Sequence, residues 1–181
     1  MKSDLSHALL HDAQELGHES RVQRDDHAAL KLWLRMLSST TQIESEIRRR
    51  LRARFGISLA RFDYMAQLYR HRGGVKMGEL SRCLMVTGGN VTGLTDELAR
   101  DALVQRVGDE ADRRAWLVKL TPKGRRAFEA MAREHEGWIL ELFAGLDDKA
   151  IHHLHQTLGQ LRVDMLRAQR VQLDKNEEIP K

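Results

Sequence analysis

The residues best suited to contact a charged partner lie between Lys76 and Arg114. Thr87 can cap a helix whose first turn leaves backbone N–H groups free to meet a phosphate. Asn90 and Thr92, close behind it, are short polar groups able to reach an adenine edge or a thymine methyl. We expect contacts to double-stranded DNA from Lys76, Arg82, Thr87, Gly88, Gly89, Asn90, Thr92, Gly93, Arg113 and Arg114.

Three glycines lie in the helix that carries these polar groups. Gly88, Gly89 and Gly93 each cost up to about 1 kcal/mol of helix stability relative to alanine. That loss is tolerable where a bare helix surface must approach DNA closely, whereas the alternative is that the glycines only loosen an ordinary turn. We favour the DNA-facing interpretation because the neighbouring elements follow in the right order.

Two predicted helices position these residues. The first covers Met77 to Leu84, and the second opens at Thr87 with Val91, Leu94 and Leu98 spaced so that they share one apolar face. Because that face packs inward, the opposite face must point to solvent. The residues expected on this outer face are Gly89, Thr92, Gly93, Asp96 and Arg100.

A two-stranded ribbon follows the second helix. Its strands, residues 104–107 and 116–120, flank the loop Gly-Asp-Glu-Ala-Asp-Arg-Arg. Arg113 and Arg114 at its tip could place a guanidinium in a narrow minor groove, although arginine pairs are also typical of a solvated face. Residues 75–124 therefore predict a winged helix-turn-helix. The expected fold class is mainly α with a small β-hairpin wing (α+β), plus a helical dimerisation region.

Long helices flank this module on both sides. Their boundaries are indicated by capping residues, glycine and proline at Asp25 or Asp26, Gly56, Ser58, Thr121-Pro122, Gly145 and Asp147. The expected organisation is a polar extension (1–24), dimerisation or linking helices (25–72), the winged module (73–126), further dimerisation helices (127–173) and a charged, frayed tail (174–181).

The flanking helices carry apolar stripes that no adjacent domain is large enough to cover. Leu30, Trp33 and Leu37 belong to one stripe, and Ile151 and Leu158 to another. Burial against the same helices of a second copy, by a two-fold axis, is the common solution. We expect a homodimer; a monomeric bundle of the terminal helices is the alternative.

Composition restricts the function further. The formal net charge of +4 over 181 residues permits a polyanionic partner without requiring one. The first residues lack the apolar core of a signal peptide, and no run approaches the roughly 20 apolar residues of a membrane span, so we expect a cytoplasmic location and no membrane partner. Because no catalytic motif has supporting context, we expect no enzyme activity, no catalytic residues and no cofactor.

Cysteine and histidine usage gives two further expectations. Cys83 is the only cysteine; it follows Leu80 by three residues and should face the core, where a thiol is usually inert. Redox sensing through Cys83 is the alternative. The cluster of His152, His153 and His155 is interpreted as surface, because metal sites need three or four converging ligands; no metal is expected.

The segments GELSRCLMVTGGNVTGLTDELARDALVQRV and DRRAWLVKLTPKGRRAF are more specific. With Asp112 and Arg114 in the wing and the exit Leu120, Thr121 and Gly124, the chain resembles the MarR family of winged-helix repressors over roughly residues 28–170. The resemblance implies that the terminal helices form the dimer and that two recognition helices contact a pseudo-palindromic operator. A winged helix that binds proteins instead of DNA is the alternative.

One position departs from the family. Many members have a basic residue where this chain has Gly93. The departure shifts the expected DNA contacts toward the backbone, Asn90, Thr92 and the wing.

The same resemblance implies a small-molecule effector. MarR-like proteins commonly bind small aromatic acids between the dimer helices and the winged module. Such a ligand weakens DNA binding only if it favours a spacing of the two recognition helices that does not fit the operator. The candidate lining residues are Trp33, Leu37, Phe62, Met65 and Tyr69. The alternative is that they are plain core.

The arginine run EIRRRLRARFG makes the effector hypothesis more specific. Glu44–Arg48 and Glu46–Arg50 have the spacing of ion pairs on a solvated helix face, whereas Arg49, Arg52 and Arg54 have no obvious partner at that spacing. This run, with RFDYMAQL and VTGGNVTGL, is similar to regulators of hydroxycinnamate breakdown that respond to acyl-coenzyme A thioesters. The hypothesis is a hydroxycinnamoyl-CoA or phenolic-acid effector whose phosphates are held by Arg48, Arg49 and Arg52.

Overall fold

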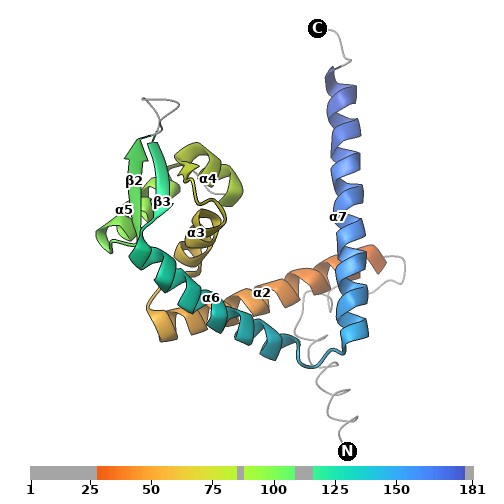
Figure 1. Cartoon of the computed structure of the whole chain (residues 1–181). Coiled ribbons are helices and arrows are strands. Elements are labelled where there is room, and N and C mark those ends of the chain that lie inside the picture. The colour runs from red at the N-terminus through yellow and green to blue at the C-terminus, as the bar shows by residue number, and fades with distance from the viewer. Residues whose placement is uncertain (1–27, 85–87, 109–115, 178–181) are drawn as a thin grey trace, which may run out of the picture. The chain divides into compact units, whose positions relative to one another are not determined.

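The computed structural model describes residues 28–84, 88–108 and 116–177. Regular structure in these ranges consists of helices and three short strands, which confirms the expected fold class (Figure 1). In chain order the elements are α2 (Ala28–Phe55), α3 (Leu59–Arg70), β1 (Val75–Lys76), α4 (Met77–Leu84), α5 (Gly88–Arg100), β2 (Val104–Gly108), β3 (Trp116–Leu120), α6 (Pro122–Phe143) and α7 (Asp148–Glu177). The chain divides into two compact units, Met1–Trp138 and Ile139–Lys181.

Local capping chemistry sets the helix boundaries. Gly56 takes the left-handed conformation (φ +64°) directly after α2, as its place at a helix end predicts. Ser58, Thr121 and Asp147 each accept a hydrogen bond from the backbone N–H three residues later, at 3.3, 2.9 and 2.7 Å. The starts of α3, α6 and α7 are thereby confirmed. The caps predicted for α2, Asp25 and Asp26, lie outside the described residues.

Two expectations about elements were wrong. The sheet has three antiparallel strands in the order β1-β3-β2, because Val75 and Lys76 pair with Val118 and Leu117. A strand of two residues shows no periodicity in the sequence, so the ribbon was predicted with two strands. The last helix, α7, also continues to Glu177, four residues into the segment expected to be a frayed tail (174–181).

The core of the first unit lies where α3, α4, α5 and the sheet meet. Tyr64, Met65 and Leu80 are fully buried there, and Leu51 of α2 is fully buried as well. Burying such side chains contributes roughly 25 cal/mol per Å² of apolar surface, which is the main force that holds the winged module together. The module is visible in Figure 1 as α3, α4, α5 and the hairpin gathered around this core.

The exit from the sheet into α6 is closed by an unusually tight contact. A Cβ atom built on Gly124 would lie 1.9 Å from the carbonyl oxygen of Leu103, so only glycine fits. The Thr121 hydroxyl donates to the carbonyl of Ala102 at 2.7 Å, and the Thr121 N–H donates to Leu103 at 3.0 Å. The motif Leu-Thr-x-x-Gly therefore holds the segment that follows α5 against the start of α6.

Large apolar side chains remain exposed on the flanking helices. On α2, Trp33 is 55% and Leu37 38% exposed, and on α7 Leu154 is 49% and Leu161 41% exposed. Among the described residues, no helix has both the length and the apolar character to cross a membrane.

Candidate nucleic-acid interface

Helix α5 has one buried face and one bare face. Val91 and Leu98 are fully buried, while Gly89, Asn90, Thr92 and Gly93 are exposed. Apart from the adjoining residues and the backbone of α5 itself, no heavy atom of the described chain lies within 4 Å of the place where a Cβ would stand on Gly89 or Gly93. These glycines therefore leave open surface, as the DNA-facing interpretation requires. Gly88 begins α5, and Thr87 lies outside the described residues.

The inner face of α5 also contains a polar residue that the sequence did not indicate. Thr95 is fully buried and donates to the carbonyl of Val91 at 2.7 Å. Its hydroxyl lies 2.5 Å from that of Tyr64 on α3. Because the single Thr95 proton goes to Val91, Tyr64 must donate to Thr95. Burial raises the pKa of Tyr64, so this donor stays protonated.

The outer face of α5 is tied to the wing. Asp96 is exposed, as predicted, and pairs with Arg106 of β2 at 2.5 Å. The carboxylate on the exposed face of α5 is thereby paired with a guanidinium.

Some basic residues near α5 are exposed to solvent, and others contact groups of the protein itself. Lys76 on β1 and Arg82 on α4 are exposed. Lys123 and Arg125 of α6 are engaged within the protein: Lys123 donates to the carbonyl of Asp101 at 2.8 Å, and the Arg125 guanidinium lies 4.9 Å from the centre of the Tyr69 ring. Asp112, Arg113 and Arg114 lie outside the described residues.

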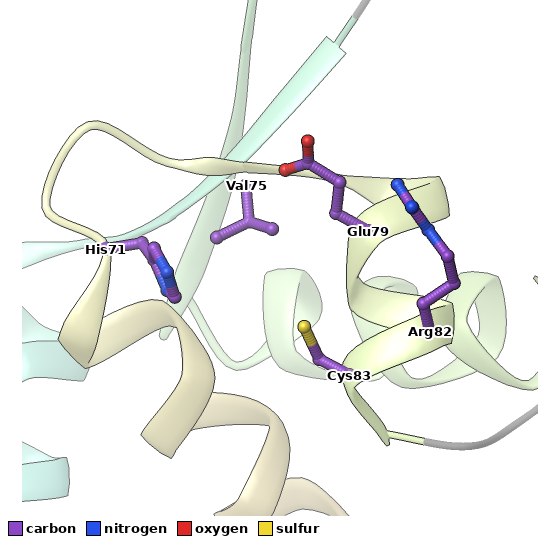
Figure 2. A pocket seen from close by; sticks show the side chains of 5 residues that line it. All are labelled: His71, Val75, Glu79, Arg82 and Cys83. Carbon is purple, nitrogen blue, oxygen red and sulfur yellow. The ribbon is translucent and has the colours of Figure 1, made fainter. Parts of the chain in front are cut away.

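Cys83 does not face the core, so that prediction was wrong. The residue is exposed and lies in the last turn of α4, rotated by about 60° from the buried Leu80. It lines a cavity of about 440 Å³ together with His71, Val75, Glu79 and Arg82. Figure 2 shows its thiol directed into that space, between His71 and the helix that carries Glu79 and Arg82.

Three of the five apolar effector candidates pack against other side chains of the described part of the chain. Phe62 and Met65 are buried core residues, and the rings of Phe62 and Tyr69 pack on Phe128 with centroids 5.4 and 4.9 Å away. The Tyr69 hydroxyl donates to Glu129 at 3.1 Å. None of the five, which include the exposed Trp33 and Leu37, lines the cavities described here.

The arginine run is more fully ion-paired than the sequence suggested. The expected pairs Glu44–Arg48 and Glu46–Arg50 form at 3.7 and 2.6 Å. Arg49 also pairs with Glu46, at 2.7 Å. Two hydrogen bonds, the stronger effect coming from Arg49 and the weaker from Arg50, lower the pKa of Glu46 to about 2.

Arg54 also has an ion-pair partner, and it borders a cavity. It pairs with Glu134 of α6 at 3.8 Å, so Arg49 and Arg54, for which no partner four residues away was expected, are paired at other spacings. The cavity measures about 340 Å³ and lies between α2 and α6. Its lining consists of Arg49, Arg50, Ala53, Arg54, Glu134 and Trp138. Arg48 and Arg52 lie outside it. No cluster of three metal-ligating side chains occurs among the residues that the structure describes.

Comparisons with known proteins agree with this architecture. Residues 55–115 match the MarR family. The transcriptional activatory protein BadR of Rhodopseudomonas palustris is 37% identical over 94 residues, which cover 49% of this chain and 54% of BadR. The match therefore spans about half the length of that relative.

Solved structures extend the likeness to most of the chain. A mutant of MarR from E. coli complexed with operator DNA shares the fold, with a TM-score of 0.65 at 21% identity over 77% of this chain and 99% of that one. A MarR family transcriptional regulator from Silicibacter pomeroyi is 32% identical with a TM-score of 0.67, over 79% of this chain and 99% of that one. Because this relative is matched over nearly its whole length, the chain belongs to the MarR family of winged helix-turn-helix transcriptional regulators, which confirms the resemblance and the expectation that it is not an enzyme.

Proposed function

We propose that this chain binds a pseudo-palindromic operator as a homodimer, with α5 in the major groove and the wing against the flanking minor groove. The observation that carries the proposal is that the two faces of α5 differ. Val91, Thr95 and Leu98 are buried on the inner face, and Gly89 and Gly93 leave the outer face without side chains. Such a surface lets the helix approach base edges closely.

The operator proposal is tested by fluorescence anisotropy with duplexes from the DNA upstream of the gene. Affinity should fall steeply as salt rises, because phosphate contacts release counterions. Asn90→Ala should reduce the preference for operator over random duplex, whereas Arg114→Ala should weaken binding to both. Equal loss on both duplexes for Asn90→Ala would show that it contacts only the backbone. Absence of binding at low salt would rule out the proposal.

The homodimer rests on the exposed apolar stripe of α7. Leu154, Leu158 and Leu161 are each at least 38% exposed, and a two-fold partner would cover them. Leu158→Arg should give a monomer in sedimentation equilibrium and weaken operator binding. The matched control is Gln156→Arg, on the same exposed helix outside the stripe. A wild-type chain that sediments as a monomer would contradict the proposal.

For the effector, we propose a hydroxycinnamoyl-CoA thioester, with the phenolic acid as the simpler possibility. Support comes from the cavity between α2 and α6, where three arginines and Trp138 line one space. Arg49 and Arg50 share Glu46, and a phosphate with several oxygens could replace that single carboxylate. The expected effect is release of the operator.

The effector proposal needs a titration of the protein–operator complex with p-coumaroyl-CoA, feruloyl-CoA and the free acids. Arg49→Gln and Arg50→Gln should raise the thioester concentration needed for release, and Arg48→Gln, which lies outside the cavity, should not. If no thioester releases DNA, this effector is excluded. A reporter fusion decides whether binding represses, as we propose, or activates, as the name of BadR states for that relative.

A second candidate function is redox sensing through Cys83. The exposure of the thiol in its cavity favours it, since a reactive cysteine must be reachable by its oxidant. Peroxide should then release the operator from the wild type but not from Cys83→Ser. An operator complex that peroxide leaves intact would exclude this function.

A further inference from the structure

One aromatic side chain of the wing is open to solvent. Trp116 begins β3 and is 60% exposed, whereas Trp138 of α6 is 8% exposed. Tryptophan side chains are highly buried on average in folded proteins. Because removing so large an apolar surface from water is favourable, an exposed indole is suited to packing against a partner.

The register of the hairpin shows which face Trp116 occupies. Residues directly opposite one another in antiparallel strands point to the same face, and the two faces alternate along each strand. Val104 pairs with Leu120, and both are buried. Arg106 pairs with Val118, which is fully buried. Trp116 stands two residues before Val118, so it shares this inner face, about 7 Å further toward the loop that joins the strands.

The same inner face of the hairpin meets α5. Arg106, in the row next to Trp116, pairs at 2.5 Å with Asp96 on the exposed face of α5. The residue opposite Trp116 is Gly108, which has no side chain that could cover the indole. A duplex that lies against the exposed face of α5 and then against the wing therefore meets the row of Trp116 between these two contacts.

The chemistry around Trp116 suits a nucleic-acid backbone. The three strands contain Lys76, Arg106 and Lys119 and no acidic residue, which favours a polyanionic partner. The DNA backbone alternates phosphates with the apolar edges of deoxyribose rings. An indole offers an apolar ring and one N–H donor, so it can pack on a sugar while it donates to a neighbouring phosphate oxygen.

We propose that Trp116 packs its indole against a deoxyribose of the bound duplex and donates Nε1–H to the adjoining phosphate. The inference rests on the proposed function, because it takes DNA as the partner of the wing. Contacts to sugar and phosphate carry no sequence information, so Trp116 adds affinity on any duplex. Because the indole is uncharged, it neutralises no phosphate and leaves the salt dependence of binding unchanged, unlike a lysine or arginine contact.

The affinity test compares Trp116→Ala and Trp116→Phe with the wild type by anisotropy of labelled operator and random duplexes over a range of salt. Trp116→Ala should weaken binding to both roughly tenfold, with a plot of log affinity against log salt parallel to that of the wild type. Trp116→Phe should keep most of the affinity. The control Gln105→Ala, exposed on the opposite face of β2, should match the wild type.

Three outcomes of this test would overturn the proposal. Undiminished affinity of Trp116→Ala would show that the indole makes no contact with DNA. A changed salt slope would mean that the variant disturbs charged contacts instead. Loss on the operator alone would make Trp116 a base contact. Urea unfolding guards against a trivial loss: because Trp116 is exposed, Trp116→Ala should unfold at the wild-type midpoint, and a lower midpoint would assign the indole to the fold.

A spectroscopic readout follows the indole directly in the full-length protein. All three tryptophans are replaced by 5-fluorotryptophan, and the fluorine signal of Trp116 is the one missing from Trp116→Phe. This signal should shift when operator is added and should not shift when the protein is concentrated without DNA, where a change would indicate a second copy as the occupant. Absence of any DNA binding by the wild type would refute the proposed function and this inference with it. Operator binding with an unchanged Trp116 signal would refute this inference alone.

Discussion

Arg106 of β2 donates from Nη2 to Oδ1 of Asp96 on α5 over 2.5 Å, so the first strand of the wing is joined to the exposed face of α5. The two side chains are 39% and 51% exposed. This pair makes the orientation of the wing depend on a residue of the exposed face of α5, which is the face that we propose contacts DNA.

The coupling between these two residues should be small and sensitive to salt. Exposed ion pairs contribute about 0.2–1 kcal/mol, so a double-mutant cycle of Asp96→Asn and Arg106→Gln should give a coupling in that range at low salt. The coupling should shrink as salt screens the charges. Urea unfolding measures it, and Glu97→Gln on the same helix is the control. A coupling that does not change with salt would show that packing joins the two residues.

The buried pair Tyr64–Thr95 should matter more for stability than the exposed ion pair. Thr95→Val keeps the shape of the side chain but leaves the Tyr64 hydroxyl without its acceptor, which costs about 1–3 kcal/mol of unfolding free energy. Tyr64→Phe should cost about 1 kcal/mol. Because the double variant leaves no unpaired hydroxyl on Tyr64, its loss should be smaller than the sum of the single losses. Additive losses in urea unfolding would contradict the shared hydrogen bond.

The sequence predicted those features of the fold that depend on neighbouring residues. Ser58, Thr121 and Asp147 cap helices through hydrogen bonds that span three residues, so composition alone indicates them. The apolar face of α5 and the two strands of the β2–β3 hairpin follow in the same way from local periodicity.

Features that depend on distant contacts were missed. The strand β1 exists because β3 pairs with it, and Thr95 is buried because Tyr64 satisfies its hydroxyl. Cys83 was placed inward because the packing around the last turn of α4 could not be anticipated from its spacing to Leu80. The partner of Arg54 lies on α6, eighty residues later in the chain, where helix spacing gives no information.

Stability should fall as the pH drops through the range in which His135 titrates. Burial lowers the pKa of His135, so the unfolded chain binds this proton at a higher pH than the folded chain does. The stabilisation is therefore full above the unfolded value of about 6.5 and is lost as the pH falls toward the lower folded value. The nearby Asp63 affects stability in the opposite direction, in a more acidic pH range. Burial raises its pKa, so the folded chain binds this proton at a higher pH than the unfolded chain does.

Urea unfolding between about pH 7.5 and about pH 5.5 isolates the histidine, because carboxyl groups titrate mainly below this window. The unfolding free energy of the wild type should decline, and that of His135→Gln should decline less. His152→Gln, at an exposed site on α7, is the control. Parallel curves for the wild type and His135→Gln would contradict the assignment.

Gly124→Ala should be among the most destabilising single changes in the winged module. Its Cβ would stand 1.9 Å from the carbonyl oxygen of Leu103, so the backbone at the end of α5 must move. Overpacking of this kind costs about 1–3 kcal/mol and more where the obstacle is backbone. Gly137→Ala, on the same helix with no atom of the described chain within 4 Å, should be neutral or stabilising. Thermal and urea unfolding should separate the two variants clearly.

Gly93→Ala should have opposite effects on folding and on DNA binding. Within the described residues, nothing lies within 4 Å of the added methyl group, and replacing a helical glycine by alanine stabilises a helix by up to about 1 kcal/mol. The unfolding free energy should therefore rise. If the bare face of α5 exists to approach DNA, the same methyl group should weaken operator binding, while Gly137→Ala should leave it unchanged. A more stable Gly93→Ala protein with undiminished operator affinity would mean that this glycine only loosens the helix, and that the expected DNA contacts must come from Asn90, Thr92 and the wing.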